Sequence, residues 1–154
     1  DVTKETNGAN LTVKNLTIDC TASYCQRGIN YNTNGTLVLE GVTVKGTNLS
    51  YALNMPGSAD NATVTISNST LKGCIALNVW GENSEINATN TTFTTVDNAE
   101  HEGYAAVALN NDGTTSAEGT TINIIGGAIA IEGNNADDSS ASSNATSTGV
   151  INIF

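Results

Sequence analysis

The sequence predicts an all-β fold in which the chain winds into a solenoid of about five coils, each built from three short strands. An internal repeat, a recurring Asn or Gly within it, and a composition poor in helix formers support this prediction. Of the 154 residues, 22 are Asn and 23 are Thr, residue types that favour turns and strands over helices. With 38% hydrophobic residues, we expect residues 1–154 to bury a core as one domain.

The first part of each repeat is a segment of eight residues, with mostly apolar side chains at alternate positions on both sides of one Asn or Gly. Alternation with a period of two predicts strands that bury one face. Since Asn and Gly tolerate a positive φ, the central position predicts a one-residue bend between two strands. The five copies are Leu11–Ile18, Leu37–Val44, Val64–Leu71, Ile86–Phe93 and Thr115–Ile122, with Asn15, Gly41, Asn68, Asn90 and Gly119 at the bend.

A shorter apolar segment, whose copies recur at spacings of 22 to 30 residues, predicts a third strand. Three strands in this length, stacked so that like strands pair, describe one coil of a single-stranded parallel β-helix. A right-handed crossover is the default for such connections. The third-strand copies are Gly28–Tyr31, Ala52–Met55, Ala76–Val79, Ala106–Leu109 and Ala128–Ile131. The side chains expected inside the first coil are Leu11, Val13, Leu16, Ile18, Ile29 and Tyr31.

These repeats resemble the right-handed parallel β-helix superfamily, the architecture of pectate lyases, phage tailspikes and many bacterial surface proteins. The resemblance covers residues 10–154. It implies the fold and leaves the function open, because the superfamily includes polysaccharide lyases, glycoside hydrolases, adhesins and structural stalks. The catalytic residues of its enzymes have no matching positions here, so no residue is assigned a catalytic role.

Two features of the C-terminal part depart from the repeat. Residues 133–148 are rich in Ser, Asn and Asp, a composition that predicts a flexible loop insertion. Gly149–Phe154 matches the start of a further copy and then stops. We therefore expect a fragment of a longer protein, whose open end is covered by the rest of the parent chain or by oligomerisation.

The charge balance and the cysteines narrow the partners and the compartment. The chain has 5 basic and 15 acidic side chains, a net charge of −10 at pH 7. Nucleic acid is not an expected partner, because the affinity of a protein for nucleic acid comes largely from Lys and Arg side chains that neutralise phosphates. Membrane insertion is not expected either, since no run of about 18 apolar residues occurs. Cys20 and Cys25 are the candidate disulfide, which fits a secreted or cell-surface protein.

Three amides and the single Trp are candidates for glycan contact. Asn30, Asn54 and Asn78 occupy the same outward position of three successive third strands, where a row of amides is suited to hydrogen bonds with a sugar. Trp80 follows the last of these strands and offers a ring for stacking on a sugar. The structural alternative is a Trp that packs its own loop.

A second group of residues is typical of protein-binding hot spots, which are rich in Tyr and Arg. These residues lie in or beside the variable loops, on what the repeat predicts to be another edge of the solenoid. Host-protein contact is therefore an alternative to glycan contact. The group consists of Tyr24, Arg27, Tyr51 and Tyr104.

The densest cluster of ionisable groups predicts the one possible cofactor, calcium. Asp97, Glu100 and Glu102 surround the only histidine, His101, and carboxylate oxygens are suited to calcium or to an acid/base pair. The alternative is an acidic surface loop without a ligand. No other cofactor is expected.

A uniform outward column suggests a further alternative. Its five threonines are expected to form a ladder, the kind of surface that ice-binding solenoids present, although charged neighbouring columns and the general suitability of Thr for exposed strands argue against that role. The predicted column contains Thr17, Thr43, Thr70, Thr92 and Thr121.

These observations predict a secreted or cell-surface binding or structural module, an adhesin or stalk that contacts a glycan or a host protein through its loops. The alternative from the resemblance is a segment of a polysaccharide lyase or glycoside hydrolase. Because no catalytic set is present in the sequence, the first prediction is preferred, and an ice-binding solenoid is the third possibility.

Overall fold

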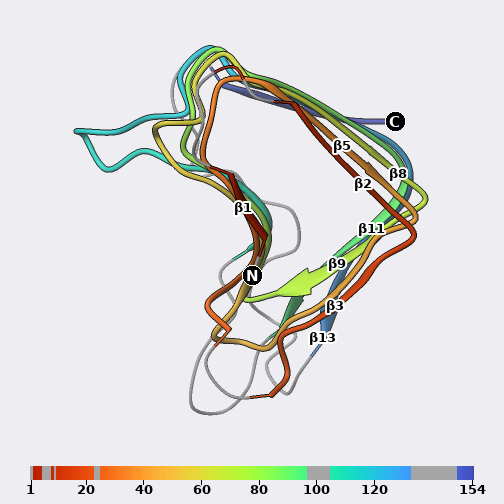
Figure 1. Cartoon of the computed structure of the whole chain (residues 1–154). Coiled ribbons are helices and arrows are strands. Elements are labelled where there is room, and N and C mark those ends of the chain that lie inside the picture. The colour runs from red at the N-terminus through yellow and green to blue at the C-terminus, as the bar shows by residue number, and fades with distance from the viewer. Residues whose placement is uncertain (1, 5–7, 9, 23–24, 97–104, 133–148) are drawn as a thin grey trace.

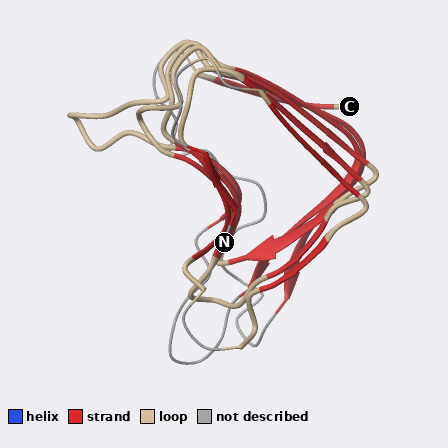
Figure 2. Cartoon of the chain, in the orientation of Figure 1, coloured by secondary structure: helices blue, strands red, loops and turns tan. Residues whose placement is uncertain are grey.

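The computed structural model describes residues 2–4, 8, 10–22, 25–96, 105–132 and 149–154. They form strands, turns and loops, with no helix among them (Figure 2), and hence none that would cross a membrane. The all-β prediction is confirmed for this part of the chain. The strands are β1 (Val2–Lys4), β2 (Leu11–Lys14), β3 (Thr17–Asp19), β4 (Arg27–Tyr31), β5 (Thr36–Glu40), β6 (Thr43–Lys45), β7 (Tyr51–Met55), β8 (Thr63–Ser67), β9 (Thr70–Gly73), β10 (Ile75–Val79), β11 (Glu85–Val96), β12 (Ala105–Leu109), β13 (Thr121–Glu132) and β14 (Val150–Ile153).

The strands form two curled sheets in which like strands of successive repeats pair in parallel (Figure 1). The five-stranded sheet has the order β1-β4-β7-β10-β12. The nine-stranded sheet follows the path β2-β5-β8-β11-β9-β6-β3, with β13 beside β11 and β14 beside β13. In Figure 1 corresponding segments of the repeats overlie one another, so the connecting loops gather at common corners. The predicted parallel pairing of like strands is confirmed.

Interior side chains align in columns, because the register places equivalent residues of adjacent repeats side by side. Leu37, for example, lies between Leu11 and Val64. The predicted interior is correct for Ile29 and Tyr31, which are fully buried. It is wrong for Leu16, which is 42% exposed. Leu16 belongs to the first repeat and so has an equivalent residue on one side, whereas the equivalent residue of the next repeat, Val42, is fully buried.

Four of the five predicted Asn or Gly bends occur in the nine-stranded sheet, where φ is positive at all four. The values are 50° at Asn15, 62° at Gly41, 48° at Asn68 and 47° at Asn90. Residues with a larger or branched side chain adopt this region at a cost, because Cβ approaches the following carbonyl oxygen. A single residue per repeat therefore sets the angle between the two halves of the sheet.

Asn68 provides a direct test of the bend. Replacing the exposed Asn68 by Ala should lower the free energy of unfolding by about 1–2 kcal/mol, since Ala lacks the tolerance of Asn for positive φ. Asn68→Gly, the matched control, should change it by no more than about 0.5 kcal/mol because Gly adopts this conformation freely. Urea unfolding of the three proteins measures both changes. Equal destabilisation by Ala and Gly would show that φ is not the cause.

The fifth copy lies in a different register from the predicted one. Ile122, rather than Thr115, pairs with Ile86, and the bend equivalent to Asn90 is Gly126, with a φ of 65°. The residue predicted for that bend, Gly119, has a φ of 68° but stacks at an earlier corner, next to Asn83. A second corner thus uses Asn or Gly with positive φ, at Asn61, Asn83 and Gly119, and the repeat pattern alone does not distinguish it from the first.

This shift also corrects two other predictions. Ala128–Ile131 was expected as a third strand but lies in β13 beside Thr92–Thr95 of the nine-stranded sheet. The expected threonine ladder consists of Thr17, Thr43, Thr70 and Thr92, and Ala128 takes the fifth place. Thr121 instead pairs with Glu85. The predicted loop insertion 133–148 lies outside the described residues.

Candidate binding site

A hollow of about 340 Å³ lies on the outer face of the five-stranded sheet. Strands β4, β7 and β10 form its floor. One side is formed by the loop after β7 and by the segment between β12 and β13, which projects beyond the neighbouring corner loops (Figure 1). The lining residues are Arg27, Tyr51, Asn54, Pro56, Gly57, Asn78, Trp80, Asp112 and Thr115.

The hollow joins residues that the sequence placed in two groups on different edges. Tyr51 pairs with Arg27 across β4 and β7, and Asn54 pairs with Asn78 across β7 and β10. Tyr51 and Asn54 reach the same face because the two residues between them are both buried in the core, which breaks the alternation of the strand. Strict alternation would have placed them on opposite faces.

The candidate amides form a hydrogen-bonded ladder, of which Asn54 and Asn78 line the hollow. Asn54 Nδ2 donates to Asn30 Oδ1, Asn78 Nδ2 donates to Asn54 Oδ1, and Asn110 Nδ2 donates to Asn78 Oδ1, each over 2.7 Å. Asn54 and Asn78 are only 5% and 3% exposed. Each amide has two N–H groups and two acceptor positions, so the ladder uses half of its hydrogen-bonding capacity.

Arg27 is the cation of the hollow, and its charge is not compensated within the described residues. Lys14 pairs with Glu40, Lys72 pairs with Glu132, and Lys45 lies near Asp19. Arg27 makes no ion pair with a described carboxylate, and its buried Nε has no hydrogen-bond partner in that part of the chain. Leaving a buried donor unpaired is unfavourable.

Asp112 is the acid of the hollow and is held by its own loop. Its Oδ1 accepts hydrogen bonds from the backbone N–H groups of Thr115 at 2.8 Å and Thr114 at 2.9 Å. These bonds favour the carboxylate form and lower the pKa of Asp112 below its ordinary value. The side chain is therefore negatively charged at neutral pH. Asp112 follows β12, which β7 and β10 separate from β4, the strand of Arg27.

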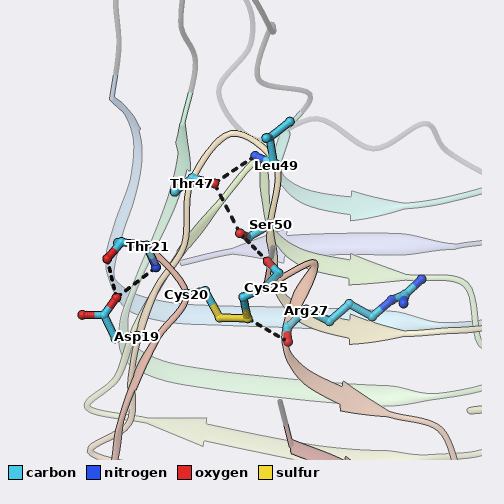
Figure 3. The surroundings of a disulfide bond; sticks show 8 residues. All are labelled: Asp19, Cys20, Thr21, Cys25, Arg27, Thr47, Leu49 and Ser50. Atoms are coloured by element: carbon cyan, nitrogen blue, oxygen red, sulfur yellow. Dashed lines mark hydrogen bonds between the residues drawn. A yellow bond between two sulfur atoms is a disulfide. The ribbon is translucent and has the colours of Figure 1, made fainter. Parts of the chain in front are cut away.

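A disulfide lies next to Arg27. Cys20 and Cys25, the candidate pair, are joined, and the Cys25 sulfur lies 3.4 Å from the carbonyl oxygen of Arg27 (Figure 3). Ser50 Oγ donates to the Cys25 carbonyl at 2.7 Å, and the backbone N–H of Tyr51 donates to Gln26 at 2.8 Å. The disulfide loop is thus attached to the next repeat, and in Figure 3 the Arg27 side chain extends away from it.

Several predicted site residues lie outside the described residues. They include two of the candidate tyrosines and the entire candidate calcium cluster. Among the described residues, no group of three His, Cys, Asp or Glu side chains is placed to hold a metal ion. The candidates concerned are Tyr24, Tyr104, Asp97, Glu100 and Glu102.

Sequence reasoning missed Asn110, which continues the amide ladder, and Asp112 and Thr115, which form the rim. Asn110 also donates to the carbonyl of Val79, at 3.0 Å. The register partner of Asn78 is Ala108, and Asn110 reaches the ladder from a position two residues further along the chain, 32 residues after Asn78. The apolar pattern of Ala105–Leu109 was the available signal, since Asn110 follows it directly.

A scan against protein-family models finds no match. Searches of curated proteins and of solved structures find no match either.

Proposed function

We propose that the curled sheets form a single-stranded right-handed parallel β-helix, and that the chain is a secreted or cell-surface module that binds a glycan. The observation that carries this proposal is the hollow, which brings Arg27, Tyr51 and Trp80 together above an amide floor. Ligand sites are concave and combine aromatic surface with a few polar groups. The disulfide is consistent with an oxidising compartment.

The chemistry of the hollow suits a sugar. Trp80 and Tyr51 are half-buried and supply apolar ring surface together with a polar edge. Asn54 and Asn78 each keep a second N–H beyond the one used in the ladder. Hydroxyl groups of a sugar both donate and accept hydrogen bonds, so they match amides whose positions the ladder already fixes. Such fixed groups reduce the entropy cost of binding.

Binding is favoured over glycoside hydrolysis because the described lining contains one carboxylate, Asp112. Hydrolysis of a glycosidic bond by retention or inversion ordinarily requires two carboxyl groups that face each other across the bond. The oxygen of Asp112 that accepts two backbone hydrogen bonds favours the ionised form, which is the opposite of a general acid with a raised pKa.

Replacing Trp80 by Ala should weaken glycan binding about tenfold, because a buried ring face at the centre of a site commonly contributes more than 1 kcal/mol. A glycan array with labelled protein, with and without calcium, would identify ligands. Trp80 is the only Trp of the chain, so its fluorescence then reports titrations of the hollow directly. Titration calorimetry gives the affinity of Trp80→Ala.

Thr65→Ala is the matched control, because Thr65 is exposed on β8 of the nine-stranded sheet and does not line the hollow. It should leave the affinity unchanged. A blank array at millimolar glycan would contradict the proposal, as would binding that Trp80→Ala does not weaken. Binding to a host protein instead, lost in Trp80→Ala, would assign the hollow to protein recognition.

A further inference from the structure

We infer that the bound glycan ends in a sugar with a single carboxylate, which pairs with the Arg27 guanidinium at the β4 side of the hollow. This inference rests on the proposed function and specifies the class of ligand. Its basis is the charge of Arg27, which no carboxylate of the described residues compensates, together with the engaged carboxylate of Asp112 and the small volume of the hollow.

The Arg27 guanidinium has an N–H donor that no described residue accepts. A guanidinium presents five N–H groups in a planar fork that matches the two oxygens of a carboxylate. The buried Nε of Arg27 has no partner among the described residues, whereas two of the described lysines have carboxylate partners within 4.0 Å. An incoming carboxylate would accept hydrogen bonds from the guanidinium where it lines the hollow and would neutralise its charge in one contact. A neutral hydroxyl would only accept a hydrogen bond.

Asp112 does not serve as the carboxylate partner of Arg27. Its charge instead limits the ligand to one acid group. Its Oδ1 already accepts from Thr114 and Thr115, and its charge lies at the rim. A second carboxylate of the ligand near this rim would meet a like charge. The net charge of −10 also repels a polyanion as it approaches. The electrostatics therefore favour a neutral chain with one terminal acid over a polyuronate.

The volume of the hollow favours binding of the end of a glycan chain. About 340 Å³ is near the lower limit for sites that enclose small ligands, and suits one or two sugar rings. The loop after β7 and the segment between β12 and β13 close one side. A terminal sugar enters such a hollow from its open side, with its acid group directed at Arg27 and its hydroxyls at Asn54 and Asn78.

Matched saccharides test the inference. The probes are 3′-sialyllactose, which ends in one acidic sugar, its methyl ester, lactose, and trigalacturonate as a polyacid. Trp80 fluorescence and calorimetry at pH 7 give the affinities. We expect 3′-sialyllactose to bind at least about tenfold more tightly than its ester, lactose or trigalacturonate, because a hydrogen-bonded charge pair contributes about 1.5–3 kcal/mol.

Arg27→Gln should weaken binding of 3′-sialyllactose about 10- to 100-fold and leave binding of the ester unchanged. Arg27→Lys keeps the charge without the planar fork of the guanidinium and should give an intermediate loss. Circular dichroism and urea unfolding establish that both variants fold.

The outcomes separate this inference from the proposed function. If the ester or lactose binds as tightly as the acid, and Arg27→Gln has no selective effect, the carboxylate inference is wrong and the glycan-binding proposal stands. If trigalacturonate binds most tightly, the restriction to one terminal acid is wrong. If no glycan binds, the proposed function fails together with the inference. Binding only to acidic peptides, dependent on Arg27, would overturn the assignment to a sugar.

Discussion

Replacing Phe93 by Ala should lower the free energy of unfolding by about 3–5 kcal/mol, the usual effect of removing a buried aromatic ring. Phe93 lies in β11, is fully buried, and pairs with Leu71 of β9 and Ile129 of β13. Only 5% of the chain is aromatic, and the surrounding core is largely aliphatic. Because the rigid strands on both sides prevent collapse of the site, much of the cavity should remain.

Phe154→Ala is the matched control for this experiment. Phe154 is the other phenylalanine and is 76% exposed, so its removal should change stability by no more than about 0.5 kcal/mol. Urea unfolding followed by circular dichroism measures both variants through the midpoint and the slope of the transition. A loss below about 1 kcal/mol for Phe93→Ala would show that Phe93 does not lie in a tightly packed core.

Replacing Asn78 by Ala should lower the free energy of unfolding by about 2–3 kcal/mol, which is a large effect for removal of a polar side chain. Asn78 lies in the middle of the amide ladder, where it donates to Asn54 and accepts from Asn110. Its loss leaves Asn54 Oδ1 without this donor in a buried position, whereas Asn110 Nδ2 retains the carbonyl of Val79. A buried polar group left unpaired costs about 1–3 kcal/mol, and the lost hydrogen bonds add to this.

A second amide ladder, formed by Asn87, Asn123 and Asn152 of the nine-stranded sheet, supplies the control. Asn152 Nδ2 donates to Asn123 Oδ1 at 2.9 Å, and both side chains are only partly buried. Because water can replace this hydrogen bond, Asn152→Ala should lower the free energy of unfolding by less than about 1 kcal/mol. Unfolding in urea measures both variants. Equal costs for Asn78 and Asn152 would show that burial does not strengthen the first ladder.

The sequence predicted the features of the fold that depend on single residues. Asn15, Gly41, Asn68 and Asn90 were identifiable because few residue types tolerate positive φ, and each was flanked by alternating apolar positions. The same chemistry produced the error in the fifth repeat. Gly119 and Gly126 both have positive φ, and single-residue spacing does not distinguish two corners that impose the same backbone requirement.

The hollow was only partly predictable, because it depends on strand register and on loops. Arg27, Tyr51 and Trp80 were candidates individually, but the two consecutive core residues Ala52 and Leu53 break the alternation of β7. This break brings Tyr51, and with it its register partner Arg27, to the face of Asn54. Asp112 and Thr115 lie in a segment without a counterpart in the earlier repeats, so no periodicity indicated their position. Local sequence patterns contain little information about such contacts between distant segments.

The amide ladders give the stack of repeats a direction. In both ladders each Nδ2 donates toward the preceding repeat, as from Asn54 to Asn30 and from Asn123 to Asn87. The amide dipoles therefore point the same way and polarise one another along the axis. A duplicated repeat inserted in tandem would extend this alignment without any change to its neighbours. Growth by whole-repeat duplication is thus chemically permissive, whereas a repeat without the Asn would divide the chain of dipoles in two.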